Sequence, residues 1–200
     1  SRGEENEKDK MRFRDVSPMD RNYIEDRLFD KADFTVETFP GGDYENCQFS
    51  HCNFSNADLT GIHFIECKFT SCNLGRAKLA KTTFRDVMFS DSKLLGLHFE
   101  DCNEFMLSME FDRCILDYSS FDGLKLQHIK FSNCHLHESG FAETDLMGAV
   151  FSNCDLQGAR FEQCNLEKAD FSTSYNYSID PGSNRLRNAR FSLNGVSGLL

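Results

Sequence analysis

Large apolar residues recur at every fifth position along most of this 200-residue chain. A first run of fifteen extends from Phe29 to Phe99 without a gap, and a second run of thirteen extends from Phe111 to Phe171. Five residues of a helix advance about 500°, so such sites would scatter around its axis, and in a strand an odd spacing alternates between the two faces. The chain must therefore turn after every five residues, with its large residues pointing inward.

A second period of twenty residues sets the number of sides. Phe111, Phe131 and Phe151 lie twenty apart, and leucines of the second run repeat at the same spacing. Four pentapeptides per turn predict a square solenoid in which like residues stack on like, and 28 repeats make about seven coils. The place two residues before each large one often holds a small residue; eight of the nine cysteines fall there, and Cys102 continues the phase of the first run. The expected core includes Phe49, Phe69, Phe89, Phe111, Phe131, Phe151, Phe171, Cys114, Cys134 and Cys154.

The repeats resemble the signature A(D/N)LxX of the pentapeptide repeat family. Matching tripeptides include Ala-Asp-Leu at 57–59, Cys-Asn-Leu at 164–166 and Ala-Asp-Phe at 169–171. The resemblance implies an all-β fold, namely a right-handed quadrilateral parallel β-helix. Within the family, the chain is similar to members of the quinolone-resistance (Qnr) type.

The start and the end of the five-residue repeat divide the chain into three parts. Residues 1–24 are expected to be a disordered tail and an N-terminal cap. Residues 25–172 form the β-helix, with a phase break at 102–108 where the five-residue register shifts by two. Residues 173–200 are expected to hold a loop, one last repeat, and a helical or loop cap.

Acidic residues gather in the sequence around the phase break. They are Glu100, Asp101, Glu104, Glu110 and Asp112. Two interpretations stay open. The acids are either a solvated charged run beside a tolerated insertion, or part of a bulge on which a partner docks.

Apolar residues also return near the C-terminus, at Phe191, Leu193, Val196, Leu199 and Leu200. They would either cap the last coil or pair two subunits. In Qnr-type proteins C-terminal elements join two rods end to end, so the resemblance implies a homodimer through this segment.

Motifs that carry catalysis or bind cofactors are absent from the sequence. It has no phosphate-binding loop, dinucleotide fingerprint, zinc-protease motif or nucleophile elbow, so we expect no enzyme and no cofactor. The cysteines lack the short spacings of zinc sites and read as small core residues with free thiols. His135 and His137 flank Leu136 and are expected to face solvent as a surface pair rather than a metal or catalytic site.

The net charge of −10 argues against direct binding of nucleic acid, which normally needs a basic patch. No apolar run is long enough for a membrane helix, and the charged N-terminus lacks a signal-peptide pattern, so a cytoplasmic location is expected. The Qnr resemblance implies a DNA mimic that binds DNA gyrase or topoisomerase IV and protects it from fluoroquinolones. Two alternatives remain, a scaffold with another protein partner and an immunity protein against a topoisomerase poison.

Overall fold

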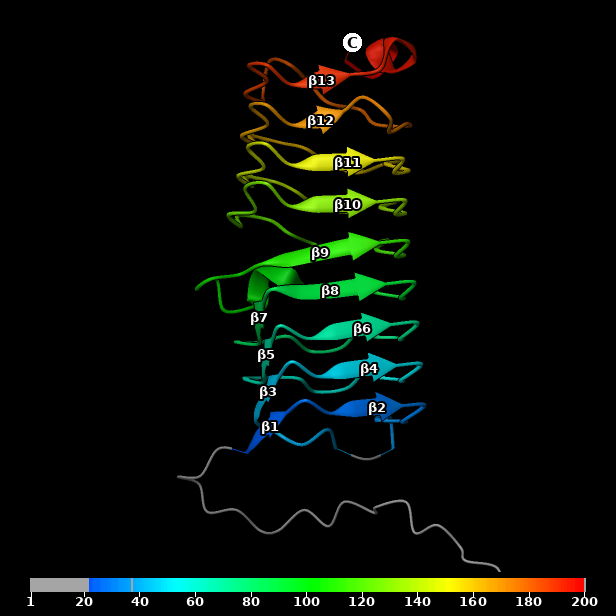
Figure 1. Ribbon diagram of the computed structural model, residues 1–200. Helices are drawn as coiled ribbons and strands as arrows, with labels where there is room; N and C mark the ends of the chain where they lie inside the picture. The colour runs from blue at the N-terminus through cyan, green and yellow to red at the C-terminus, as the bar shows by residue number, and fades with distance from the viewer. Residues whose placement is uncertain (1–21, 37, 200) are drawn as a thin grey trace, which may run out of the picture.

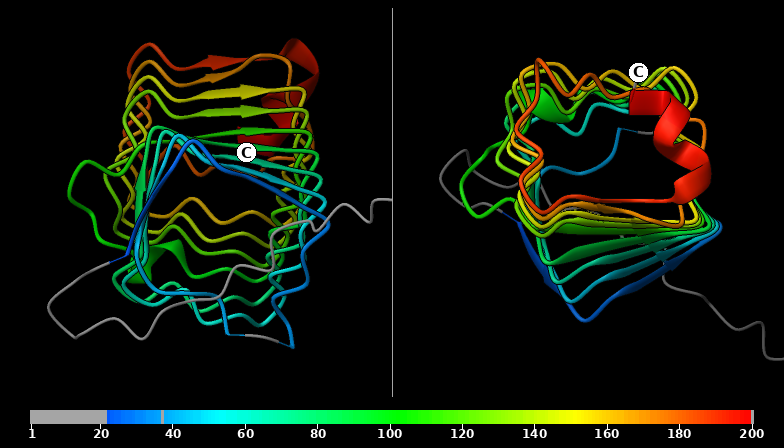
Figure 2. Two further views of the ribbon diagram at one scale, coloured as in Figure 1. Left: turned by 60° about the horizontal axis from the view of Figure 1, so that its bottom comes forward. Right: turned by 90° about the horizontal axis from the view of Figure 1, so that it is seen from above.

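The computed structural model describes residues 22–36 and 38–199 and shows a four-sided rod (Figures 1 and 2). The chain winds as a right-handed quadrilateral parallel β-helix of about eight turns, which confirms the predicted fold. We number the sides in chain order by their first inward residues: side 1 at Ile24, side 2 at Phe29, side 3 at Phe34 and side 4 at Phe39. Seen along its axis, the rod has the square outline that a twenty-residue period predicts (Figure 2).

Side 2 carries a parallel sheet that runs the length of the rod (Figure 1). Its strands, in spatial order, are β2 (Leu28–Asp30), β4 (Gln48–Ser50), β6 (Lys68–Thr70), β8 (Val87–Ser90), β9 (Met109–Asp112), β10 (Lys130–Ser132), β11 (Val150–Ser152), β12 (Asp170–Phe171) and β13 (Arg190–Phe191). Nine stacked strands enclose eight turns. The sequence predicted about seven, because the isolated repeat at 188–191 was not counted as a further coil.

Side 1 carries a shorter parallel sheet in the first half of the rod. Its strands are β1 (Tyr23–Glu25), β3 (Asp43–Glu45), β5 (His63–Ile65) and β7 (Thr83–Arg85). Sides 3 and 4 are held by single bridges between successive coils. Two short 3-10 segments complete the described structure, η1 (Phe99–Asp101) and η2 (Leu193–Leu199).

The core is a set of stacked rings and leucines along the rod axis. Phe111 pairs in register with Phe131, and their rings lie 5.1 Å apart and nearly parallel. Phe89 pairs with Phe111 across the phase break, twenty-two residues later, so the core stacking continues through it. The ten core residues predicted from the sequence are all buried.

The inward small residue also satisfies backbone carbonyls. The thiol of Cys67 donates to Tyr44 O at 3.3 Å, one coil earlier. Ser119 goes further, because its Oγ accepts from Leu97 N at 3.1 Å and donates to Leu94 O at 2.7 Å. The hydroxyl thus joins two backbone groups of a turn in the preceding coil. Small polar side chains are therefore bonding elements of the coil as well as core filler.

The corner between successive sides requires a left-handed backbone. Residues two places after the inward one have positive φ, including His51 (54°), Arg76 (58°) and Glu138 (55°). Such a conformation costs a residue with a Cβ about 1–2 kcal/mol. Hydrogen bonds to the next coil offset that cost, as when His51 N donates to Thr70 O at 2.9 Å.

The coil extends past both ends of the predicted range 25–172. β1 pairs with β3 at one end and β13 with β12 at the other. The segment expected to be a loop after Phe171 also belongs to the rod, because Tyr177 and Ile179 are buried in the core. Ile179 pairs with Phe161, eighteen residues earlier, and Arg185 then pairs with Asn165 at the usual twenty. This local shortening hid the coil from the periodicity. The expected tail and cap at residues 1–21 lie outside the described residues.

The segment η2 lies across the C-terminal end of the rod (Figure 2). Leu199 packs against the core, and Gly198 O accepts from Ile179 N at 2.8 Å. A Cβ on Gly198 would clash with Tyr177 O, so this close approach requires glycine. Across the described part of the chain, helices are too short to cross a membrane.

Candidate interaction surface at the phase break

At the phase break the chain leaves the wall of the rod. Asn103 N donates to Thr82 O at 2.8 Å, and Ser108 N donates to Phe84 O at 3.0 Å. Between these two bonds the chain uses four residues where the coil below uses one. The excess is expelled as a loop over 102–108, which projects from the rod (Figures 1 and 2).

The expelled loop presents apolar side chains to solvent. Phe105 is 74% exposed and Met106 is 56% exposed, whereas Leu107 turns back and packs against the core. The loop is held by local bonds, since Asn103 Oδ1 accepts from Phe105 N at 3.0 Å and Glu104 O accepts from Leu107 N at 3.3 Å. A large exposed ring on an ordered loop is a typical anchor for a protein partner.

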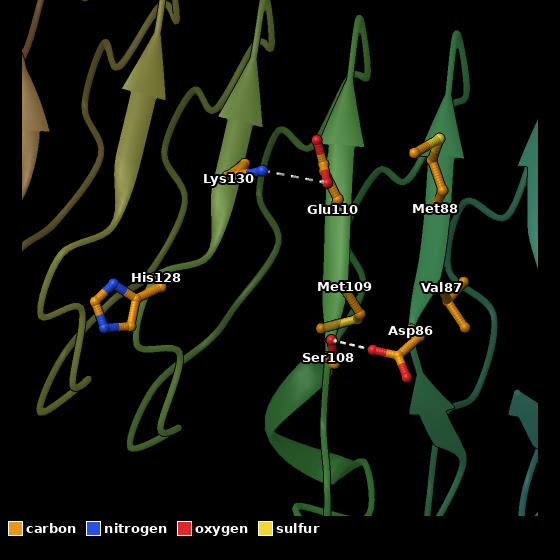
Figure 3. A pocket seen from close by; sticks show the side chains of 8 residues that line it. All are labelled: Asp86, Val87, Met88, Ser108, Met109, Glu110, His128 and Lys130. Carbon is orange, nitrogen blue, oxygen red and sulfur yellow. Dashed lines mark hydrogen bonds and ion pairs between the residues drawn. The ribbon is translucent and has the colours of Figure 1, made fainter. Parts of the chain in front are cut away.

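A shallow groove of about 320 Å³ adjoins the loop at the edge between sides 1 and 2 (Figure 3). Val87 and Met109 form a buried apolar floor. Ser108, the last residue of the loop, donates to Asp86 Oδ1 at 3.0 Å on one wall. The complete lining is Asp86, Val87, Met88, Ser108, Met109, Glu110, His128 and Lys130. We call the loop 102–108 together with this groove the break surface.

The predicted acidic residues do not form one patch. Glu100 and Asp101 lie in η1, at the corner between sides 4 and 1, and Glu104 lies exposed in the loop. Glu100 Oε1 accepts from the ring Nδ1 of His98 at 2.9 Å. This hydrogen bond is the main reason why the pKa of His98 is raised.

The other two predicted acids lie on side 2, where they flank Phe111 in β9. Glu110 pairs with Lys130 at 3.9 Å along the rim of the groove. Asp112 forms an ion pair with Arg113, and its Oδ1 accepts from Asn133 Nδ2 at 3.2 Å. Three of the five acids near the break thus lie beside a cation or His98, and the apolar loop between them is the more distinctive feature.

Sequence reasoning located the break but missed the groove. The signal for the loop was the two-residue shift, which must put extra residues outside the wall. The groove combines residues from three successive coils, and Met88 lies beside Glu110 through the twenty-two-residue spacing that the insertion creates. Its lining therefore depends on how the insertion is absorbed.

The predicted C-terminal cluster is divided by the structure. Phe191 stacks on Phe171 with ring centroids 5.5 Å apart, and Leu199 packs on the core, so both serve the end of the rod. Leu193 points away and is 92% exposed. Leu200 and the side chain of Val196 lie outside the described residues.

Comparison with known proteins defines the class. Residues 43–121 and 96–171 match the model of the pentapeptide repeat region. These matches cover more than half of the chain, and the protein belongs to the pentapeptide repeat family. No curated protein sequence matches it.

Solved structures share this fold. A trypsin-treated form of QnrB1, a plasmid-mediated fluoroquinolone resistance protein, aligns with a TM-score of 0.53 and 19% identity over 87% of this chain and 94% of QnrB1. A second trypsin-treated form gives 0.53 and 18% identity over 88% and 94%. HetL, a pentapeptide repeat protein involved in heterocyst differentiation regulation in the cyanobacterium Nostoc, gives 0.48 and 17% over 86% and 87%. At these identities the QnrB1 comparisons establish a common fold.

Proposed function

We propose that this protein is a non-enzymatic interaction protein that docks a protein partner on the break surface. The observation that carries the proposal is the exposed ring of Phe105 on an ordered loop beside an apolar groove. The loop stands on a rigid frame, because the coils on either side remain in register. Little ordering entropy is then lost when a partner binds.

The groove is suited to recognition rather than to acid–base chemistry. Its acid Glu110 faces Lys130, and Asp86 accepts from Ser108. A catalytic carboxylate normally stands in an environment that shifts its pKa toward its task. Here the charged groups are paired at the rim around an apolar floor.

We propose a type II DNA topoisomerase, DNA gyrase or topoisomerase IV, as the first partner to test, with protection from fluoroquinolones as the outcome. The shared fold with QnrB1 supports this choice. The net charge of −10 also suits a basic partner surface. Cations lie on all four sides, for example Arg85, Lys68, Lys93 and Lys78 on sides 1 to 4, so recognition would rest on the loop more than on uniform mimicry of DNA.

The test is gyrase supercoiling with and without ciprofloxacin, titrated with purified protein. We compare the wild type with Phe105→Ala and with a deletion of Glu104 and Phe105, which restores the twenty-residue period. The matched control is Tyr118→Ala, which removes an exposed ring on another side of the rod. Circular dichroism verifies that all variants retain the β-helix.

We expect protection by the wild type and by Tyr118→Ala, and at least a tenfold loss of potency in the two loop variants. Equal potency of the deletion variant would remove the break surface from the proposal. If the wild type neither binds gyrase nor protects it, the topoisomerase assignment is wrong, and a scaffold with another partner takes its place. An immunity protein would instead protect against a different topoisomerase poison in the same assay.

A further inference from the structure

Two imidazoles and a carboxylate come together on side 3, away from the break surface. His135 and His137 flank the buried Leu136, and alternate residues of an extended segment project from the same face. In the next coil Asp155 lies directly opposite His135, as their backbone bridge shows. The sequence predicted the histidine pair on the surface, but the third member comes from twenty residues away.

The distances within this cluster are close to those of a metal site. One potential ligand atom from each residue lies within 4.8 Å of the others, and His137 Nε2 is 2.9 Å from Asp155 Oδ2. Around a four-coordinate Zn²⁺, bonds of about 2.1 Å place neighbouring ligand atoms about 3.4 Å apart. The His135 ring is exposed, and its nearest ligand atom lies within 4.8 Å of those of both partners.

The surroundings hold the carboxylate in place. Asp155 Oδ1 accepts from Asn176 Nδ2 at 2.8 Å and from Gln157 N at 3.3 Å, which leaves Oδ2 facing the histidines. Such outer hydrogen bonds orient the ligands of metal sites. His137 Nε2 is shielded from solvent and forms an ion pair with Asp155 Oδ2. This nitrogen and this oxygen are therefore already directed toward each other, as two ligands of one cation would be.

We propose that His135, His137 and Asp155 bind one divalent first-row transition cation, with Zn²⁺ as the first candidate. Two imidazoles and a carboxylate are a ligand set typical of such ions, and water would complete the coordination. The nine cysteines do not compete in the folded protein, because all of them are buried. The site is independent of the topoisomerase proposal, since it lies on a different side and uses none of the same residues.

The test is calorimetric titration of the full chain, without a histidine tag, with ZnCl₂ at neutral pH. We expect one ion per chain, and at least a tenfold weaker Kd in His135→Ala, His137→Ala and Asp155→Asn. Asn176→Ala, which removes an outer hydrogen bond, should weaken binding about tenfold. The matched control His51→Ala removes an exposed histidine at a corner of side 2, outside both proposed sites, and should bind like the wild type.

Titration with Co²⁺ identifies the ligands independently. We expect weak visible bands of nitrogen and oxygen ligation, without the near-ultraviolet band of cobalt bound to thiolate. Circular dichroism of the metal-free variants verifies folding, which the exposed position of His135 favours. Absence of binding at millimolar Zn²⁺, undiminished binding by the histidine variants, or a thiolate band would each overturn the proposal.

Discussion

Single hydroxyl groups inside the rod replace backbone hydrogen bonds. Ser119 Oγ bridges Leu97 N and Leu94 O, two backbone groups of one turn in the preceding coil. Ser139 occupies the equivalent place one coil later, but its acceptor Leu116 O already receives Ser119 N at 3.0 Å. The two serines therefore differ in what their removal leaves unsatisfied.

We predict that Ser119→Ala lowers the free energy of unfolding by about 1–3 kcal/mol, because it strands a buried donor and a buried acceptor. Ser139→Ala should cost less, since Leu116 O keeps its backbone partner. Urea denaturation of both variants measures the difference. Equal losses would contradict the bridging role.

The stacked rings give a second prediction at this scale. Phe131 lies between Phe111 and Phe151, with centroid distances of 5.1 and 4.9 Å. Phe131→Ala should therefore cost about 3–5 kcal/mol, because it removes contacts above and below and leaves a cavity. Denaturant melts against Tyr118→Ala, whose ring is exposed, provide the comparison. A loss under about 1 kcal/mol would contradict the inward stacking.

At the scale of the element, the coil was predictable and its irregularities were not. The five- and twenty-residue periods predicted the walls, the inward residues and the site of the break. They could not show that Ile179 belongs to the core, because a shortening by two residues there is cancelled before Arg185. The left-handed corners also escaped prediction, since Lys, Glu and Arg occupy several of them beside Asn. The Asp155 partner of His137 required the register between coils, which neither residue reveals alone.

The segment η1 at the base of the loop carries a pH-sensitive contact. Glu100 raises the pKa of His98, so the ion pair stabilises the fold fully below the unfolded pKa of about 6.5 and is lost as pH rises through the folded pKa. NMR titration of the His98 ring should show this elevated pKa in the wild type. In Glu100→Gln the pKa should fall back toward about 6.5. An unchanged pKa would mean that Glu100 is not the cause.

At the scale of the whole molecule, the C-terminal segment η2 covers the core at the end of the rod and leaves an apolar side chain exposed to a second copy of the chain. Leu199 seals the core, whereas Leu193 at the start of η2 stays 92% exposed at the tip of the rod. A large exposed apolar residue in that place suits pairing of two rods end to end.

We predict a homodimer through this end. Light scattering after size exclusion should give twice the monomer mass for the wild type and the monomer mass for Leu193→Asp. Met88→Asp, on an exposed position of side 2 in the middle of the rod, is the control and should remain dimeric. A monomeric wild type at all concentrations tested would contradict the prediction.

The left-handed corners affect which substitutions such a protein can accept during evolution. Because the corner conformation is held by backbone bonds to the next coil, its occupant is free to be His51, Arg76 or Glu138. The three outward-facing positions of every pentapeptide can thus be substituted, while successive coils keep their spacing of about 4.8 Å. Outward-facing residues can therefore be substituted one at a time, and the surface can acquire new binding properties, while the inward residues and the backbone bonds maintain the fold.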